Sequence, residues 1–177
     1  MSMCGVLFAG FGGQGLLFSG KVLATAGLIE NREVSWFPSY GPEMRGGTAN
    51  CGVRLADEPI GSPIVSQPDI LVVMNIPSLH KYADEVVPGG IIITDASLVK
   101  ARADRTDIRL FEVEATKISQ DEKLDGISNM ILIGKLVKES GIVSPDTIEA
   151  AVHKCVGGKK ARLPEHNIRA IRLGMSL

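Results

Sequence analysis

The sequence lacks paired cysteines. Its three cysteines, Cys4, Cys51 and Cys155, are an odd number and lie far apart, and no CxxC motif occurs. Secreted disulfide frameworks and CxxC-based zinc or iron–sulfur sites need closely spaced or paired thiols. We therefore expect a reducing, cytoplasmic location and no iron–sulfur cluster or zinc ion bound by this chain alone.

Strong charge of one sign and long apolar runs are also missing. The net charge is -1, which argues against nucleic acid as the main partner. No apolar run reaches membrane-spanning length, and the N-terminus lacks a signal peptide's basic region and cleavage site. Aromatic residues are only 5%, which favours the aliphatic core typical of parallel sheets. The length of 177 residues suits a single domain over residues 1–177.

Familiar catalytic motifs are absent as well. The sequence has no GxSxG, no Walker lysine and no paired carboxylate motif. The histidines, His80, His153 and His166, have no Cys, Asp or Glu at metal-ligand spacing. We therefore predict no catalytic residue and no metal ligand in this chain.

What is present starts near the N-terminus, where a strand-like run, Val6–Ala9, leads into a glycine-rich loop and an apolar helix, predicted from Gly13 to about Glu30. Strand, glycine loop and helix open many nucleotide-binding α/β units. Bare glycines let a phosphate approach, and the helix N-terminus offers N–H groups to an anion. The candidate binding residues of this loop are Gly10, Gly12, Gly13, Gln14 and Gly15.

Two interpretations of this loop remain open at this point. It binds a phosphate or cofactor, or it only lets the strand pack closely on its helix. Gln14 is unusual for a dinucleotide site, and its amide can reach a ligand or tie down the loop. The helix itself has little polar surface, so its outer side meets another subunit or is buried within a thick domain.

The second predicted strand, Glu33–Phe37, ends without a carboxylate. A Rossmann dehydrogenase places an acidic residue there to bind ribose hydroxyls, so NAD in its standard pose is disfavoured. The next segment, Ser39–Asn50, is rich in glycine and proline, as binding or interface loops are. Either it serves a site or interface, or it is a surface loop in which Glu43 pairs with Arg45. Its candidate residues are Tyr40, Glu43, Arg45, Gly46 and Gly47.

The rest of the chain alternates buried strands with helices. Cys51–Leu55 and a short partner strand from Ile60 are predicted to form an inserted hairpin. Asn75 follows the strand Asp69–Met74 and is expected at the sheet edge where α/β folds bind ligands. Further predicted strands are Ile91–Thr94 and Arg109–Val113, and further predicted helices are Pro77–Tyr82, Asn129–Ser140, Pro145 to about Val156, and Lys159 to about Gly174. The predicted fold is α/β, with a mostly parallel Rossmann-like sheet, an inserted hairpin and helices on both faces.

Taken together, Gly10–Gly15 and Ser39–Thr48 resemble the gamma subunit of the 2-oxoacid:ferredoxin oxidoreductases, over essentially the whole chain. The fold would then be like domain III of pyruvate:ferredoxin oxidoreductase. The Pro-Glu-Met-Arg-Gly-Gly-Thr-Ala form, from Pro42 to Ala49, is closer to the 2-oxoglutarate branch than to the pyruvate branch.

The resemblance implies an enzyme that converts a 2-oxoacid, coenzyme A and oxidised ferredoxin into an acyl-CoA, carbon dioxide and reduced ferredoxin. Thiamine diphosphate with Mg²⁺ is expected between the alpha and beta subunits, and iron–sulfur clusters in beta or a delta subunit. This chain would assist assembly and the approach of coenzyme A without binding a cofactor alone, and a homodimer of the isolated chain is left open. The alternatives are a free-standing nucleotide-binding reductase and a scaffold whose glycine loop only turns a corner.

Overall fold

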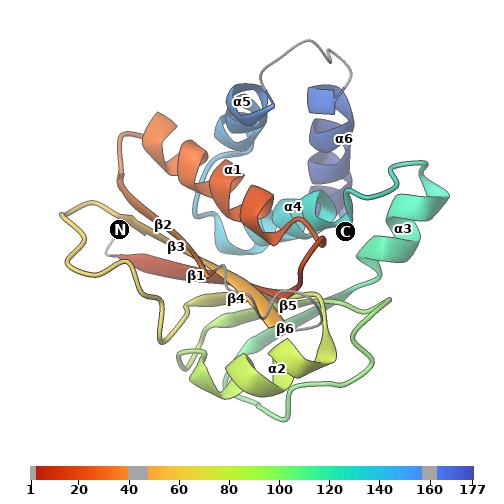
Figure 1. Ribbon diagram of the computed structural model, residues 1–177, viewed down its shortest axis with the longest axis horizontal. Helices are drawn as coiled ribbons and strands as arrows, with labels where there is room; N and C mark the ends of the chain where they lie inside the picture. Colours follow the sequence, from red (N-terminus) through yellow and green to blue (C-terminus); the bar gives the residue numbers. More distant parts are fainter. Residues whose placement is uncertain (1–2, 40–47, 157–162) are drawn as a thin grey trace.

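The computed structural model describes residues 3–39, 48–156 and 163–177 (Figure 1). Tyr40, Glu43, Arg45, Gly46 and Gly47 lie outside the described residues. The strands are β1 (Cys4–Phe11), β2 (Glu33–Ser39), β3 (Thr48–Ala56), β4 (Ile70–Val73), β5 (Ile91–Asp95) and β6 (Arg109–Val113). The helices are α1 (Leu16–Ile29), α2 (Ile76–Tyr82), the 3₁₀ turn η2 (Ala83–Glu85), α3 (Ala115–Asp121), α4 (Ser128–Ser140), α5 (Pro145–Cys155) and α6 (Leu163–Ser176).

The strands form one sheet in the order β2-β3-β1-β4-β5-β6. β1, β4, β5 and β6 pair in parallel, whereas β3 runs antiparallel to both of its neighbours. The predicted mostly parallel α/β fold with a hairpin is therefore confirmed. Parallel pairing needs a crossover between successive strands, and helical segments supply it after β4.

The position of the hairpin was predicted wrongly. β3 pairs with β2, with Trp36 opposite Val53, and Ile60 lies in irregular structure. The chain after β3 instead passes over the sheet, where the Val65 side chain packs beside Gly5 and Gly52. Two bare glycines leave a recess that Val65 fills, so this segment covers the sheet without extending it.

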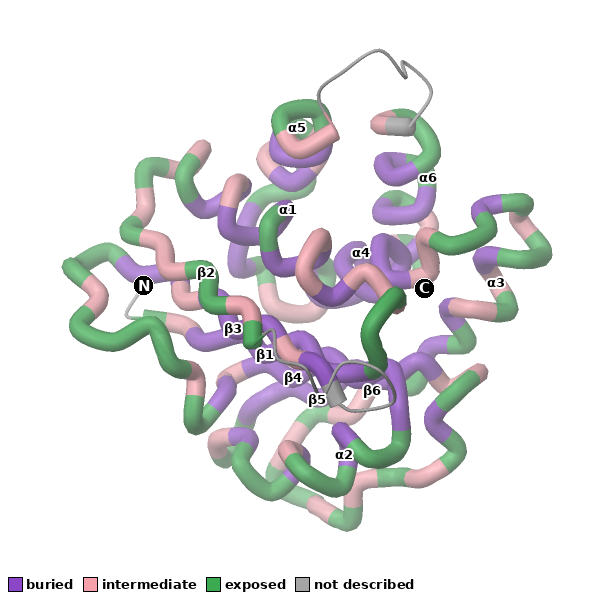
Figure 2. The backbone as a smooth tube through the Cα atoms, viewed as in Figure 1, coloured by how far each residue is buried: buried purple, intermediate pink, exposed green. Residues whose placement is uncertain are grey.

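The sheet has helices on both faces, and the two layers differ in size. α1, α4, α5 and α6 cover one face, and α2 lies on the other (Figure 1). Residues of β1 alternate between the layers: Val6 and Phe8 belong to the larger core, Leu7 and Ala9 to the smaller one. This alternation is the period-two pattern of a strand buried on both faces. Figure 2 shows the resulting buried strands at the centre of the molecule.

Helix α1 lies between the sheet and α5. Gly20 and Gly27 bring it close to Cys51 and Leu55 of β3. On the α5 side, the hydroxyl of Thr25 lies 3.2 Å from the sulfur of Cys155. Contact with the sheet and with α5 thus buries part of the apolar surface of α1, while Leu28 stays 62% exposed.

Two of the predicted helix boundaries depend on a specific residue. α4 ends at Gly141, which has a left-handed φ of 60°, and α5 begins after Ser144, whose hydroxyl accepts a hydrogen bond from the Thr147 N–H. Both ends agree with the sequence prediction. The described part of α6 begins at Leu163, four residues after the predicted start at Lys159.

Candidate functional site

The glycine loop joins the carboxyl end of β1 to the N-terminus of α1. Gly13 and Gly15 have φ angles of 92° and 77°, which L side chains rarely adopt. A Cβ at Gly13 would have no described atom within 4 Å, so among the described residues this position is open on the side where a side chain would stand. Gly15 caps α1 without a side-chain hydrogen bond, and the first-turn N–H groups of a helix have no acceptor within the helix. The loop therefore presents bare backbone next to the positive end of a helix dipole.

The side chain of Gln14 is held by the backbone on both sides. Its Oε1 accepts a hydrogen bond from the Phe11 N–H at 2.6 Å, and its Nε2 donates to the Met74 carbonyl at 2.9 Å. Glycine at position 10 leaves room for this arrangement, because a Cβ there would collide with the Gln14 amide oxygen. Of the two roles open to Gln14 from sequence, the structure shows the one that ties the loop to β4.

Asn129 holds the loop from the helical side. Its Nδ2 donates to the Gly15 carbonyl and to the Ser19 hydroxyl, both at 3.1 Å. A side chain at Gly15 would meet the Asn129 amide at 2.5 Å. From the sequence, Asn129 is placed only at the start of a helix, although an asparagine in an otherwise apolar helix is a signal that it bonds a specific partner.

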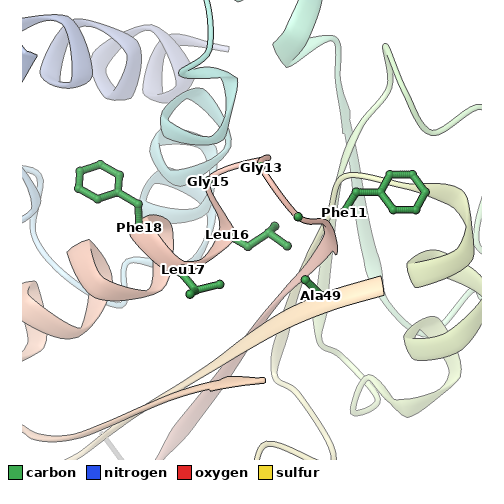
Figure 3. Close-up of a pocket in the computed structure, with 8 residues that line it drawn as sticks. Phe11, Gly13, Gly15, Leu16, Leu17, Phe18 and Ala49 are labelled. Atoms are coloured by element: carbon green, nitrogen blue, oxygen red, sulfur yellow. The ribbon is translucent and has the colours of Figure 1, made fainter. Parts of the chain in front are cut away.

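Two hollows lie on either side of the loop. One, of about 320 Å³, is shown in Figure 3, where Phe11 and Phe18 point in opposite directions away from Leu16. Its described lining is uncharged and consists of Phe11, Gly12, Gly13, Gly15, Leu16, Leu17, Phe18 and Ala49. The other, of about 370 Å³, is lined by Gly13, Gly15, Phe18, Gly126, Ile127, Asn129, Cys155, Val156 and Asn167. The loop is the wall shared by both hollows, so its position determines the shape of each.

The remaining predicted residues divide into two groups. Asn75 lies at the expected sheet edge, but it is buried and lines neither hollow. Its Oδ1 accepts from the Ser78 N–H at 2.8 Å, so it caps α2. For the undescribed loop residues only the flanks are known. Thr48 pairs with Phe11, and Ser39 pairs with Asn50, so this segment leaves and rejoins the sheet beside the glycine loop.

The described lining of the two hollows carries no charged side chain. Among the described residues, no group of three or more His, Cys, Asp or Glu side chains is placed to hold a metal ion. Cys51, near the start of α1, is buried, and burial raises its pKa from 9.0 to about 11. No helix in the described ranges combines the length and apolar character that crossing a membrane requires.

Comparison with known proteins shows which family this chain belongs to. The sequence pattern of the family described as Pyruvate ferredoxin/flavodoxin oxidoreductase matches residues 5–177, so the chain belongs to that family. It is similar to the ketoisovalerate oxidoreductase subunit VorA of Methanothermobacter thermautotrophicus, with 37% identity over 171 residues, or 96% of this chain. It spans only 35% of the length of that relative.

A second relative matches along most of both chains. The 2-oxoglutarate synthase subunit KorC of Methanocaldococcus jannaschii is 36% identical over 150 residues, covering 83% of this chain and 80% of the relative. The keto/oxoacid ferredoxin oxidoreductase gamma subunit of Geobacter sulfurreducens has a similar structure, with a TM-score of 0.83 at 25% identity, covering 98% of this chain and 96% of that one. Because these relatives are subunits of oxidoreductases, the alternative of a free-standing reductase is not favoured.

Proposed function

We propose that residues 1–177 form one gamma-type domain, a subunit of a 2-oxoacid:ferredoxin oxidoreductase that carries no catalytic group of its own. The assembled enzyme would convert a 2-oxoacid, coenzyme A and oxidised ferredoxin into an acyl-CoA, carbon dioxide and reduced ferredoxin. The relatives named as KorC, VorA and gamma subunits support this assignment.

The cofactors of the assembled enzyme belong to other subunits in this proposal. Thiamine diphosphate and Mg²⁺ would bind between alpha and beta subunits, and iron–sulfur clusters in beta or delta would pass electrons to ferredoxin. The thiols of this chain do not fit a cluster, because Cys4, Cys51 and Cys155 lie on β1, β3 and α5, and no described group of ligands converges on one point.

In this proposal the chain helps coenzyme A to approach the active site of the assembled enzyme. One observation carries the idea: a Cβ at Gly13 would meet no described atom within 4 Å, and Gly13 borders a hollow at the N-terminus of α1. Gly12 shares that hollow, while Gly10, Gln14 and Gly15 fix the shape of the loop. Such a cradle suits a phosphate or an amide of the coenzyme A chain.

The second predicted loop extends this site. We propose that Tyr40, Glu43, Arg45, Gly46 and Gly47 contact coenzyme A or a neighbouring subunit, because the strands that flank them end beside the glycine loop. Asn75 would support the same edge by capping α2. For the oxoacid we propose 2-oxoglutarate. Because the sequence identities to KorC and VorA are similar, activity with 2-oxoglutarate has to be compared with activity with 2-oxoisovalerate.

The first test is to purify the complex from the native cell through this chain, identify the partner subunits by mass, and measure turnover. We expect the complex to reduce ferredoxin fastest with 2-oxoglutarate, more slowly with 2-oxoisovalerate and pyruvate, and only with coenzyme A present. The isolated chain should show no turnover. Turnover by the isolated chain, or a complex without oxoacid activity, would contradict the proposal.

The second test concerns the glycine loop. Gly13→Ala places a methyl group on the open side of the loop, and we expect the KM for coenzyme A to rise about tenfold while the KM for the oxoacid is unchanged. The matched control is Gly89→Ala, because Gly89 also has positive φ, at 78°, with no described atom within 4 Å, and lies before β5. If the KM for coenzyme A in Gly13→Ala equals that in Gly89→Ala, this loop does not bind coenzyme A.

A further inference from the structure

Gln14 makes hydrogen bonds that join two elements far apart in sequence. Its amide oxygen binds the Phe11 N–H within the loop, and its amide nitrogen binds the Met74 carbonyl, 60 residues away, just after β4. Met74 in turn donates its N–H to the Ala9 carbonyl at 2.9 Å. The loop is therefore fastened to the end of the neighbouring strand, not only to its own turn.

Asn129 makes the equivalent connection on the opposite side. It is buried, and its Nδ2 binds the Gly15 carbonyl, 114 residues away in sequence. The same nitrogen binds the Ser19 hydroxyl in the first turns of α1. The glycine loop is thus held between β4 and α4 by two side-chain amides.

The conformation of the loop explains why two attachments are needed. Gly13 and Gly15 both have positive φ, and glycine loses more conformational freedom on ordering than any other residue. A loop of this composition stays in one geometry only if the surrounding structure fixes it. One attachment acts through Gln14, the middle residue of the tripeptide Gly13–Gly15, and the other through the Gly15 carbonyl. Neither places an atom over Gly13, where a Cβ would meet no described atom within 4 Å.

We infer that Gln14 and Asn129 are positioning residues, which hold the glycine loop in the shape that receives coenzyme A. This inference rests on the proposed function of the loop. Neither amide needs to touch coenzyme A, because the hydrogen bonds described above go to Phe11, Met74, Gly15 and Ser19. Their effect is to reduce the ordering cost at binding, which is how preorganisation increases affinity.

The experiment uses the complex purified with this chain, carrying Gln14→Met or Asn129→Leu. Each substitution keeps the approximate side-chain shape and removes the hydrogen bonds. We expect the KM for coenzyme A to rise about tenfold in each variant. We expect the kcat at saturating coenzyme A and the KM for the oxoacid to stay within about twofold of the wild type. The control is Gln120→Met, at an exposed position on α3.

A partial variant separates the two bonds of Gln14. Gln14→Glu keeps an oxygen that accepts from the Phe11 N–H but loses the donor to the Met74 carbonyl. The carboxylate oxygen that replaces the donor faces the Met74 carbonyl, and its negative charge lies beside the proposed phosphate site, so the KM for coenzyme A should rise at least as far as in Gln14→Met. This variant also carries the test if Gln14→Met does not assemble. A merely structural role would lower stability or yield in these variants without a selective change in the KM for coenzyme A.

The outcomes distinguish this inference from the proposed function. If Gly13→Ala raises the KM for coenzyme A while Gln14→Glu, Gln14→Met and Asn129→Leu leave it unchanged, the loop handles coenzyme A and the positioning role is wrong. If Gly13→Ala also has no effect in an assembled complex, the proposed role of the loop fails first. A selective rise in the KM for coenzyme A in all of the loop and amide variants supports both the proposed role of the loop and the positioning role of the two amides.

Discussion

At the residue scale, the two thiols on the strands are shielded from ionisation. Burial raises the pKa of Cys51 to about 11, although a hydrogen bond from Trp36 opposes part of the shift. Burial also raises the pKa of Cys4 to about 12, and the nearby Asp69 carboxylate adds to the effect. In both cases the folded protein binds the proton more tightly than the unfolded chain does.

The shift at Cys51 predicts a loss of stability at alkaline pH. With a folded pKa of about 11 and an ordinary value of 9.0, the stabilisation is fully present below pH 9 and is lost as pH rises through the folded value. We expect this thiol to account for a fall of about 2 kcal/mol in the free energy of unfolding between pH 8 and pH 11. Urea unfolding at both pH values measures it.

The variants make this prediction specific. Cys51→Ala should show a smaller fall in the free energy of unfolding than the wild type, by that same amount. The control, Cys155→Ala, removes a thiol from α5 but leaves Cys51 in place, so it should keep the wild-type fall. An unchanged pH dependence in Cys51→Ala would contradict the assigned shift.

Residue types predicted the glycine loop, but the partners of its side chains could not be predicted. The Gln14 amide binds the Met74 carbonyl, and the Asn129 amide binds the Gly15 carbonyl, each across a long sequence separation. Backbone acceptors have no residue signature, so only the fold reveals which carbonyl an amide reaches. Asn75 was placed at the sheet edge from sequence, and its role as the cap of α2 was missed although its signal is local, because asparagine is a favoured N-cap residue and a proline follows in the first turn.

At the element scale, α4 and α6 approach closely through two glycines. A Cβ at Gly134 would collide with the Ile171 carbonyl of α6, and one at Gly174 with the Ile131 carbonyl of α4. The two contacts are reciprocal, so each glycine receives the backbone of the other helix. Close approach of this kind lets Ile131 and Ile171 bury fully in the shared core.

This contact predicts the opposite of what helix propensity alone would give. Alanine is about 1 kcal/mol better than glycine in a helix interior, yet Gly134→Ala should lower the free energy of unfolding by about 1 to 3 kcal/mol, because the helices must separate. Chemical unfolding measures this. Gly61→Ala is the control, since a Cβ there meets no described atom within 4 Å, and it should be neutral or slightly stabilising. Stabilisation by Gly134→Ala would rule out the close backbone contact.

The misplaced hairpin also belongs to this scale. Both Glu33–Phe37 and Cys51–Leu55 were recognised as strands, but their pairing was not. Strand propensity is local, whereas pairing depends on which strand turns back on which. The glycine- and proline-rich segment between Ser39 and Thr48 indicated a loop, and the register shows that the strands on either side of it pair antiparallel.

At the scale of the whole molecule, the sheet order depends on long-range contacts. Hydrophobic runs and turn residues predicted the strand positions and the fold class, because both follow from local patterns. They could not predict that β3 would separate β1 from β2, or that α5 would cover α1. The apolar character of α1 fits burial against a subunit or against α5 equally well, and only the arrangement of the helices shows that α5 covers part of it.

The unequal helical layers predict unequal local stability. In α4, every residue from Asn129 to Val137 is buried, whereas in the short α2 only Ser78 and Leu79 are (Figure 2). Local opening costs less where few apolar contacts are lost. We expect the α2 amides to exchange hydrogen through a local opening with a free energy several kcal/mol below that of global unfolding, and the α4 amides to exchange only on global unfolding.

Native-state hydrogen exchange at increasing urea concentration measures both layers in one experiment. Local openings expose little surface and depend weakly on urea, so the free energies for α2 should stay flat at low urea and join those for α4 as urea rises. Leu79→Ala should lower the opening free energy of α2 by about 2 to 5 kcal/mol, because Leu79 anchors this helix in the smaller core. Equal free energies and equal urea dependence for α2 and α4 would show that the two layers unfold as a single unit. In that case the smaller core would be as cooperative as the larger one, despite its lower burial.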